Sequence, residues 1–216
     1  MNNMNQSSVD PEARFWNRIA KRYARKPVAD QQAYETKLAK TDSYLKPTDQ
    51  MLEIGCGTGT TAIHHAPNVA HVLATDISGE MIAIARGKAE AANVTNIDFK
   101  VASVDNLLAQ AGSFDIILAH SILHLLPDVD RVLVQLHELL TPGGLLISST
   151  ACVRDIMPLF RCVGPLGKLL RVMPYVNVFG QSELEAWFAA TGFDIEYLWQ
   201  PKPKDGVYIV ARKRDA

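Results

Sequence analysis

Three glycines at alternate positions, Gly55, Gly57 and Gly59, directly follow a short apolar run that contains an acid, Glu53. Glycine adopts backbone angles that are closed to other residues, and it removes the side chains that would keep a ligand away from the main chain. A second acid, Asp76, ends the next apolar run. The stretch therefore predicts a tight turn at which a ligand contacts the backbone between two carboxylates.

Two histidines, His120 and His124, follow another apolar run and are the natural candidates for acid–base chemistry. A neutral imidazole can take a proton from a nucleophile near neutral pH. We interpret His120 as a base or a substrate-orienting residue. His124 has the same candidate role, although packing or local hydrogen bonding would also account for it. The other histidines are scattered, and we expect them to be structural: His64, His65, His71 and His137.

Alternating strand and helix patterns are expected to position these residues. The predicted strands span residues 51–54, 71–75, 96–102, 114–119, 145–150, 193–199 and 206–212, and helices are predicted at 60–66, 78–92, 127–140 and 181–191. Apolar strands separated by helices indicate a parallel sheet that is covered on both faces. This pattern predicts a doubly wound α/β fold, in which ligands bind beyond the carboxyl ends of the strands.

Two helices precede this core, and an irregular segment interrupts it. Asp10 as a cap and Pro11 at the first position start a basic amphipathic helix, which Pro27 ends. A second helix is predicted to run to Lys46. Prolines and glycines break the apolar stretch 153–178, so we expect short helical pieces there.

The bulk properties indicate one domain of 216 residues, with 48% hydrophobic residues. Its expected parts are a helical cap (1–46), a ligand-binding core (50–150), a lid insertion (151–180), and a last helix with two strands (181–216). A formal net charge of −1 favours neither nucleic acid nor stable membrane insertion. Three cysteines without zinc-ligand spacing predict no metal site and a reducing compartment. Without a signal peptide or an apolar membrane span, we expect a cytoplasmic protein.

Two kinds of cofactor fit a glycine turn followed by an acid after the second strand. A dinucleotide would require Gly-x-Gly-x-x-Gly, so that backbone N–H groups meet a pyrophosphate. Here Glu53 lies just before the turn, and its carboxylate would repel a pyrophosphate but attract a cationic ligand. This favours S-adenosylmethionine.

The string LEIGCGTG at 52–59 resembles motif I of class I S-adenosylmethionine-dependent methyltransferases. The resemblance continues through TDIS at 75–78, SFDIILA at 113–119 and LTPGG at 140–144, in the family's order. The chain is similar to the ubiquinone and menaquinone methyltransferase-like group within this family. It implies a Rossmann-like seven-stranded sheet whose last strand is antiparallel, S-adenosylmethionine as the cofactor, and transfer of a methyl group to a small molecule.

The resemblance also implies roles for individual residues. The residues placed against the methionine part of the cofactor are Glu53, Gly55, Cys56, Gly57, Thr58 and Gly59. Asp76 would hold the ribose hydroxyls, with Ile77 and Met81 packed on adenine. Ser103 and Val104 stand where the family usually has the Asp and Ala of Gly-Asp-Ala, so the usual charged contact to the adenine amine is missing.

Three further residues complete the implied cofactor site. Ala119 and His120 would border the methyl group, and Tyr23, in a segment that resembles the family's Ile-Ala-x-x-Tyr, would close over the cofactor. Methyl transfer is an in-line displacement, so alignment and exclusion of water matter most.

The irregular segment at 151–180 is the remaining indication of the acceptor. Its apolar side chains predict a lid over a small, largely apolar acceptor, with Met157, Phe160, Met173, Tyr175 and Phe179 as substrate-binding residues. Covering of the sheet by the same side chains is the structural alternative. A lipid or quinone methyltransferase that works at a membrane surface is a second hypothesis, and a non-catalytic cofactor-binding module or partner subunit is a third.

Overall fold

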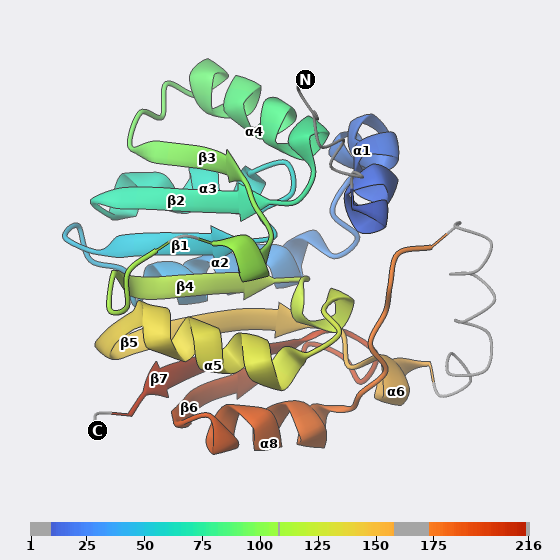
Figure 1. Ribbon diagram of the computed structural model, residues 1–216, viewed down its shortest axis with the longest axis vertical. Helices are drawn as coiled ribbons and strands as arrows, with labels where there is room; N and C mark the ends of the chain where they lie inside the picture. The colour runs from blue at the N-terminus through green and yellow to red at the C-terminus, as the bar shows by residue number, and fades with distance from the viewer. Residues whose placement is uncertain (1–9, 108, 158–172, 215–216) are drawn as a thin grey trace, which may run out of the picture.

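A seven-stranded sheet in the order β3-β2-β1-β4-β5-β7-β6 organises the chain (Figure 1). The computed structural model describes residues 10–107, 109–157 and 173–214. The strands are β1 Gln50–Ile54, β2 His71–Asp76, β3 Ile97–Val101, β4 Phe114–His120, β5 Leu140–Thr150, β6 Phe193–Trp199 and β7 Val207–Lys213. β7 is antiparallel to both of its neighbours, and the first five strands pair in parallel. The predicted Rossmann-like sheet with an antiparallel last strand is confirmed.

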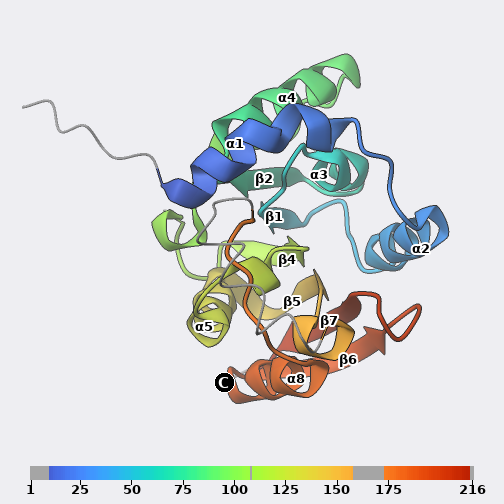
Figure 2. The same cartoon turned by 90° about the vertical axis from the view of Figure 1, so that its right-hand side faces the viewer.

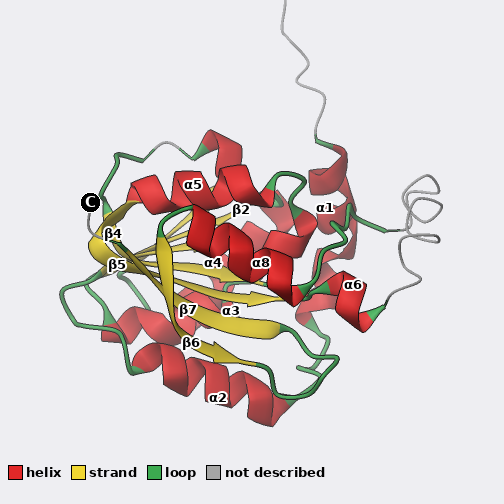
Figure 3. Ribbon diagram, turned by 90° about the horizontal axis from the view of Figure 1, so that it is seen from below, coloured by secondary structure: helices red, strands yellow, loops and turns green. Residues whose placement is uncertain are grey.

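Helices cover both faces of this sheet (Figure 3). The described α-helices are α1 Pro11–Ala24, α2 Gln31–Asp42, α3 Thr60–His65, α4 Gly79–Ala91, α5 Val129–Leu139, α6 Val153–Ile156 and α8 Gln181–Ala190, and the 3₁₀ turns are η1 Ala66–Asn68, η2 Val104–Asn106 and η3 Leu123–Leu125. One buried apolar cluster joins the sheet to α5 and α8, and a second joins it to α3 and α4. The central strands β1 and β4 contribute residues to both clusters and are therefore buried on both faces, as is typical of a parallel sheet.

The alternation of side chains along the strands sends three polar residues to one face. Leu118 and Ile147 belong to the apolar cluster under α3 and α4. Because strand side chains alternate with a period of two, His120 and Ser149 project from the same face two residues later, at the carboxyl ends of β4 and β5. Glu53 occupies the corresponding place on β1. The register places His120 directly beside Ser149.

The second helix ends four residues earlier than the sequence predicts. α2 stops at Asp42 because the chain tightens there: the N–H of Tyr44 donates to the carbonyl of Thr41 at 2.9 Å, and the N–H of Leu45 donates to that of Asp42 at 3.2 Å. Such i to i−3 bonds commonly close the last turn of a helix. Tyr44 and Leu45 still pack against the core, so their apolar character reflects burial after the helix.

The fifth strand begins earlier than predicted, at Leu140, immediately after α5. Leu140 pairs with Phe114, and Leu145 pairs with Ile116, so residues 141–144 form an irregularity in the ladder. Gly143 has a φ of 67° there, a conformation that favours glycine. The Thr-Pro-Gly-Gly segment between the predicted helix and the predicted strand is thus a bulge between two paired parts of β5.

The first helix lies across the carboxyl end of the sheet, next to α4 (Figure 2). As predicted, Asp10 caps it, because its side chain accepts the N–H of Glu12 at 2.8 Å. Asn17 fixes the helix in place, since its Oδ1 accepts the hydroxyl of Ser78 at 2.7 Å and the N–H of Glu80 at 3.2 Å. α1 is therefore fastened to the start of α4.

The lid insertion expected over residues 151–180 stays a prediction. α6 is a short helical piece of the expected kind. Phe160 and the apolar residues that follow it lie outside the described residues, so the structure gives no account of that part of the segment.

Candidate active site

The glycine turn after β1 is shaped by contacts that exclude side chains. Gly55 has a φ of 62°, and a Cβ atom on it would lie 2.8 Å from the side chain of Ile122. Gly59 has a φ of 73°, and its Cβ would lie 2.8 Å from that of Ala85. Both the backbone angles and the space therefore require glycine. As predicted from the sequence, the chain makes a tight turn at this point.

Hydrogen bonds hold the turn rigidly against the second strand. The N–H of Gly57 donates to Oδ2 of Asp76 at 2.9 Å, and the N–H of Cys56 donates to the carbonyl of Thr75 at 2.9 Å. On the outer side, Nζ of Lys88 donates to the hydroxyls of Thr58 and Thr60, at 2.8 Å and 2.9 Å. The turn is thus preorganised.

Asp76 lies at the end of β2 with both carboxylate oxygens engaged by backbone N–H groups. Oδ1 accepts the N–H of Ser78 at 2.8 Å, and Oδ2 accepts that of Gly57. Burial raises the pKa of Asp76, and these two bonds oppose the rise. Each carboxylate oxygen has lone pairs left for a further donor. Asp76 can therefore accept hydrogen bonds from ligand hydroxyls.

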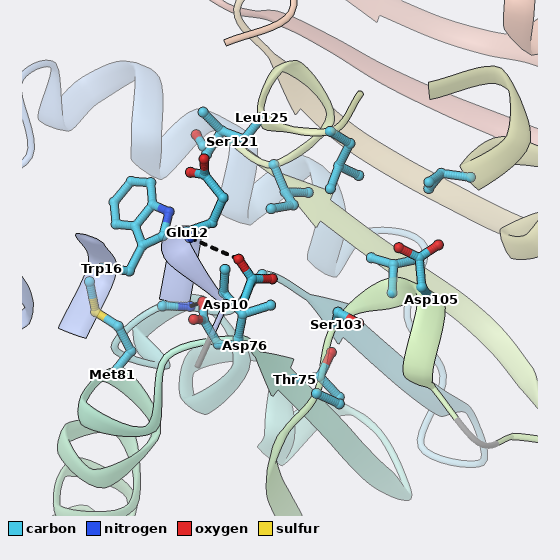
Figure 4. A pocket seen from close by; sticks show the side chains of 18 of the residues that line it. Asp10, Glu12, Trp16, Thr75, Asp76, Met81, Ser103, Asp105, Ser121 and Leu125 are labelled. Carbon is cyan, nitrogen blue, oxygen red and sulfur yellow. Dashed lines mark hydrogen bonds between the residues drawn. The ribbon is translucent and has the colours of Figure 1, made fainter. Parts of the chain in front are cut away.

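A first cavity of about 310 Å³ opens beside Asp76 (Figure 4). In Figure 4, Trp16 and Met81 lie on one side of Asp76, and Ser103 and Asp105 lie on the other. Many of the sequence-predicted cofactor residues line it: Tyr23, Gly55, Gly57, Asp76, Ile77, Met81, Ser103, Val104 and His120. Apolar walls on either side of the Asp76 carboxylate suit a nucleoside, whose base packs and whose ribose donates hydrogen bonds.

The polar end of this cavity contains Ser103, which stands where the family usually has an aspartate. The Ser103 hydroxyl accepts a hydrogen bond from the N–H of Asn106 at 3.2 Å and so caps η2. Ser103 also forms part of the cavity wall. Asp105 also lines the cavity and contributes a carboxylate to this part of its wall. Its side chain pairs with Arg131, another lining residue.

A second cavity of about 640 Å³ lies on the other side of the glycine turn. The two cavities share five residues: Tyr23, Gly55, Gly57, His120 and Ser121. The remaining walls of the second cavity come from the α1–α2 connection, α2, the turn residues Cys56 and Thr58, the end of β5, and residues 201–206. The glycine turn and His120 therefore form the junction between two adjoining binding spaces.

Glu53 lines the second cavity with a buried carboxylate that lacks a full set of partners. Its side chain is only 3% exposed, and Oε2 has no hydrogen-bond partner among the described residues. Burial, with repulsion from Asp76 as a further cause, raises the pKa of Glu53 to about 8. An unpartnered buried carboxylate is costly, and a ligand ammonium would satisfy it. This atom fits the amino group of a methionine moiety.

His120 lies at the junction of the two cavities with a free ring nitrogen. Its Nε2 is buried and has no hydrogen-bond partner among the described residues. Burial, together with the neighbouring His65 and Lys37, lowers the pKa of His120 to about 3. The imidazole is therefore neutral near pH 7, as a proton acceptor must be.

His124 lies in η3 and belongs to neither cavity lining. Burial lowers its pKa to about 4, and its carbonyl accepts the N–H of Asn177 at 2.8 Å. Among the two predicted histidines, the geometry favours His120 for a direct role.

Tyr23 lines both cavities. Its ring lies near the turn, since Cε1 would be 3.9 Å from a Cβ atom placed on Gly57. Burial and the nearby Asp76 raise the pKa of its hydroxyl. This position agrees with the closing role that the sequence resemblance implies.

Two other predicted residues line neither cavity: Gly59 packs under α4, and Ala119 is fully buried in the core.

Two described residues of the predicted lid segment, Tyr175 and Asn177, are hydrogen-bonded to residues that line the first cavity. The N–H of Tyr175 donates to Oε2 of Glu12 at 3.1 Å, and the side chain of Asn177 donates to the carbonyls of Leu126 and Pro127, both at 3.0 Å. Glu12, Leu126 and Pro127 all line that cavity. Residues 175–177 therefore connect its two rims.

The predicted substrate residues in the described chain lie away from both linings. Phe179 is 1% exposed and packs edge-on against Trp187, with ring centroids 5.0 Å apart. Met157 is 52% exposed, and Met173 and Tyr175 are partly buried. Their binding of substrate stays a prediction, as does that of Phe160.

Sequence reasoning missed the residues of α1 and α2 that complete the two cavities. Trp16 and Glu12 line the first, and Tyr34 and Lys37 line the second. The basic amphipathic first helix was a usable signal, because the resemblance already placed its Tyr23 over the cofactor. No local pattern distinguishes Lys37 from any other helical lysine.

One group of described side chains has the spacing to hold a metal ion: Asp42, His64 and His65. Hydrogen bonds account for it, since Asp42 meets His65 Nδ1 at 2.7 Å and His64 Nε2 at 3.0 Å. Asn68 Nδ2 also donates to Asp42, at 2.9 Å. The group joins α2 to α3.

The parallel sheet, glycine turn, carboxylate after β2 and two adjoining cavities define a nucleoside-binding α/β protein of the doubly wound class. Residues 51–144 match the family described as a methyltransferase domain. This match, together with the fold and the glycine turn, supports membership of the class I S-adenosylmethionine-dependent methyltransferases, whose cofactor is S-adenosylmethionine.

Curated relatives and solved structures agree with this membership. A ubiquinone biosynthesis O-methyltransferase of Xanthomonas axonopodis pv. citri (strain 306) is 31% identical over 155 residues, covering 68% of this chain and 63% of the relative. The protein of that description from Xylella fastidiosa (strain 9a5c) is 29% identical over 153 residues, covering 68% and 61%. The chain thus spans less than two thirds of either relative.

Among solved structures, an S-adenosylmethionine-dependent methyltransferase from Mesorhizobium loti superposes with a TM-score of 0.70 at 21% identity. The superposition covers 85% of this chain and 99% of that one. At this identity the likeness shows the shared fold.

Proposed function

We propose that this protein transfers a methyl group from S-adenosylmethionine to a small-molecule acceptor by in-line displacement. The observation that carries the proposal is the junction of two cavities at the glycine turn and His120. One cavity has the features of a nucleoside site, and the other is large enough for a separate small molecule. Two ligands bound on either side of one turn could place a methyl donor and an acceptor in line.

The residues of the first cavity and the turn, together with Glu53 in the lining of the second cavity, fit the cofactor. Asp76 would accept the ribose hydroxyls, Met81 and Ile77 would pack on the base, and the orphaned Oε2 of Glu53 would bind the ammonium. Bound there, the cofactor supplies an electrophilic methyl group on a sulfonium centre. Tyr23 would keep water from the junction.

His120 is the residue that we assign to the acceptor. Its neutral imidazole with a free Nε2 would take the proton of the acceptor, or orient it, at the mouth of the second cavity. The named relatives are O-methyltransferases, which supports a hydroxyl oxygen as the accepting atom. The acceptor that we propose is a small molecule. We also propose that the chain is a single domain with the four parts predicted from the sequence.

Calorimetry with S-adenosylmethionine tests the cofactor site. The variant that combines Glu53→Gln with Asp76→Ala should bind the cofactor much more weakly than the wild-type protein. A product screen for S-adenosylhomocysteine across phenols, amines, thiols, carboxylates and lipids then tests the reaction. Formation of S-adenosylhomocysteine above the acceptor-free rate with one class supports the proposal. Absence of cofactor binding by the wild-type protein would refute it.

A membrane-associated acceptor is a second proposal, which the surface of α1 supports. Arg14, Lys21, Arg22 and Arg25 are exposed on this helix, next to the rims of both cavities. No helix among the described residues has the length and hydropathy to span a membrane. Sedimentation with anionic vesicles at low salt tests this idea, and a protein that stays in the supernatant would remove it.

The non-catalytic alternative is less well supported. A partner subunit that only binds the cofactor has no use for a second cavity with free polar atoms beside the first. The cytoplasmic location and the exclusion of nucleic acid stay predictions from the sequence.

A further inference from the structure

Within the described chain, three buried polar atoms without hydrogen-bond partners belong to residues that line the second cavity. They are Oε2 of Glu53, Nε2 of His120 and Oδ2 of Asp205. Buried polar atoms are almost always satisfied by protein, water or ligand. Because Glu53 has its expected partner in the cofactor, the other two remain for the acceptor. The acceptor is therefore expected to carry polar groups at this end.

A lysine lies among these atoms. Lys37 extends from α2 into the cavity wall, and its Nζ donates to Oγ of Ser149 at 3.2 Å. Ser149 is the direct register partner of His120 on the neighbouring strand, and strands in a sheet lie about 4.8 Å apart. The Lys37 ammonium is thereby tied to the residue beside the proposed base.

No ion pair neutralises this ammonium within the described chain. Lys37 forms no salt bridge there, and its ammonium donates a hydrogen bond to the neutral hydroxyl of Ser149. Asp30, which raises the pKa of Lys37, is itself paired with Lys202 at 2.6 Å. The net shift of the Lys37 pKa is downward, because burial lowers it more than Asp205 and Asp30 raise it. An ammonium with three donors and one neutral acceptor has donors left for a ligand anion.

We propose that Lys37 binds the deprotonated reacting oxygen of the acceptor and thereby selects acceptors with an acidic hydroxyl group. This inference rests on the proposed function. In the step, the acceptor O–H bond breaks and its proton goes to Nε2 of His120. The oxygen then forms a bond to the methyl carbon, and the carbon–sulfur bond breaks with its electron pair left on sulfur.

The two residues complement one another chemically. An imidazole whose pKa is lowered to about 3 holds a proton weakly, so it removes one from a hydroxyl only if the resulting anion is stabilised. The Lys37 ammonium supplies that stabilisation. N–H donors bond oxygen far better than sulfur, and the positive charge opposes an ammonium group, so the site discriminates against thiols and protonated amines.

The other charged groups of the cavity keep separate roles. Asp205 Oδ2 would accept a donor on a second polar substituent of the acceptor, and Lys88 is engaged by Thr58 and Thr60. Lys204 and Lys26 also line the cavity but are exposed. Lys37 differs from them because it is partly buried and held beside the base.

The ionisation of 4-nitrophenol, whose phenolate absorbs visible light, tests this proposal without turnover. The full-length protein is saturated with S-adenosylhomocysteine and titrated with pH. We expect the wild-type protein to lower the apparent pKa of the bound phenol by about 1 unit, a tenfold change in ionisation. Lys37→Met should abolish the shift, and Lys37→Arg should retain it because the charge is kept.

Lys46→Met is the matched control, because Lys46 is exposed and lines neither cavity. It should behave as the wild-type protein. The absence of a shift in the wild-type protein, or an equal shift in Lys37→Met, would overturn the role of Lys37. Calorimetry with S-adenosylhomocysteine on the same samples separates the two proposals. Missing cofactor binding refutes the proposed function, whereas intact binding without a phenolate shift refutes only the inference about Lys37.

Discussion

Replacement of Glu53 by glutamine should stabilise the cofactor-free protein while it weakens cofactor binding. The carboxylate is buried, and its pKa is raised from 4.5 to about 8. In the unfolded chain the group ionises near its ordinary value. As pH rises from 4.5 to 8, the folded state therefore loses stability relative to the unfolded state, because its buried acid resists ionisation. Glutamine keeps the shape of the side chain and removes this penalty.

The size of the effect follows from the two pKa values. At 1.36 kcal/mol per unit, the penalty is about 1 kcal/mol at pH 5 and about 4 kcal/mol at pH 8. Urea denaturation of the cofactor-free proteins measures the difference in the free energy of unfolding at these two pH values. The advantage of Glu53→Gln should grow with pH. Glu90→Gln is the control, because Glu90 is exposed on α4 and should leave the pH profile unchanged.

Cofactor binding should respond in the opposite sense. An ammonium placed beside Glu53 favours the ionised carboxylate, so binding near pH 7 should release almost one proton, which calorimetry in two buffers of different ionisation enthalpy detects. Glu53→Gln should lose about 10- to 100-fold in affinity, the worth of a charge-assisted hydrogen bond. Equal affinity, or a stability difference that does not change between pH 5 and pH 8, would refute the assignment.

Three further predictions follow from the site. Gly55→Ala should lower stability by about 1–3 kcal/mol and weaken cofactor binding, because its Cβ would meet Ile122 at 2.8 Å with φ at +62°; thermal denaturation and calorimetry measure both, and wild-type values would contradict the close fit. His120→Ala should lower kcat about 100-fold or more with the cofactor Kd unchanged, whereas wild-type turnover would exclude a role for the imidazole. His124→Leu should make the stability of the protein less sensitive to acid than that of the wild type. Burial lowers the pKa of His124 to about 4, so the contribution of its neutral imidazole to stability is present above about pH 6.5 and is lost as pH falls toward 4. Denaturation at pH 7 and pH 5 checks this, and parallel profiles for the variant and wild type would be evidence against it.

The cofactor side of the site could be predicted from the sequence because it is built from short, contiguous segments. β1, the glycine turn and α3 follow one another directly, and Asp76 comes at the end of the next strand. In a parallel sheet, the carboxyl ends of such strands meet at one edge. Turn residues and alternating strands are local properties of the chain, so the fold and nine of the 23 residues that line the first cavity could be predicted.

Some element boundaries depended on the tertiary structure. α2 ends at Asp42 through i to i−3 hydrogen bonds, although apolar residues continue beyond it, because these residues pack on the sheet. β5 continues through a bulge at residues 141–144, since pairing with β4 resumes on both sides of it. Apolar periodicity records burial and cannot distinguish a helix from a packed loop.

The acceptor side was decided only by the tertiary structure. Lys37 and Asp205 are far apart in the sequence, yet both line the second cavity, and Lys37 reaches Ser149 across 112 positions. No spacing predicts such a meeting, because it depends on how α2 packs across the sheet and where the 201–206 connection returns. The sequence determined the glycine turn, the two acids and the cofactor, whereas packing of distant segments decided which side chains face the acceptor.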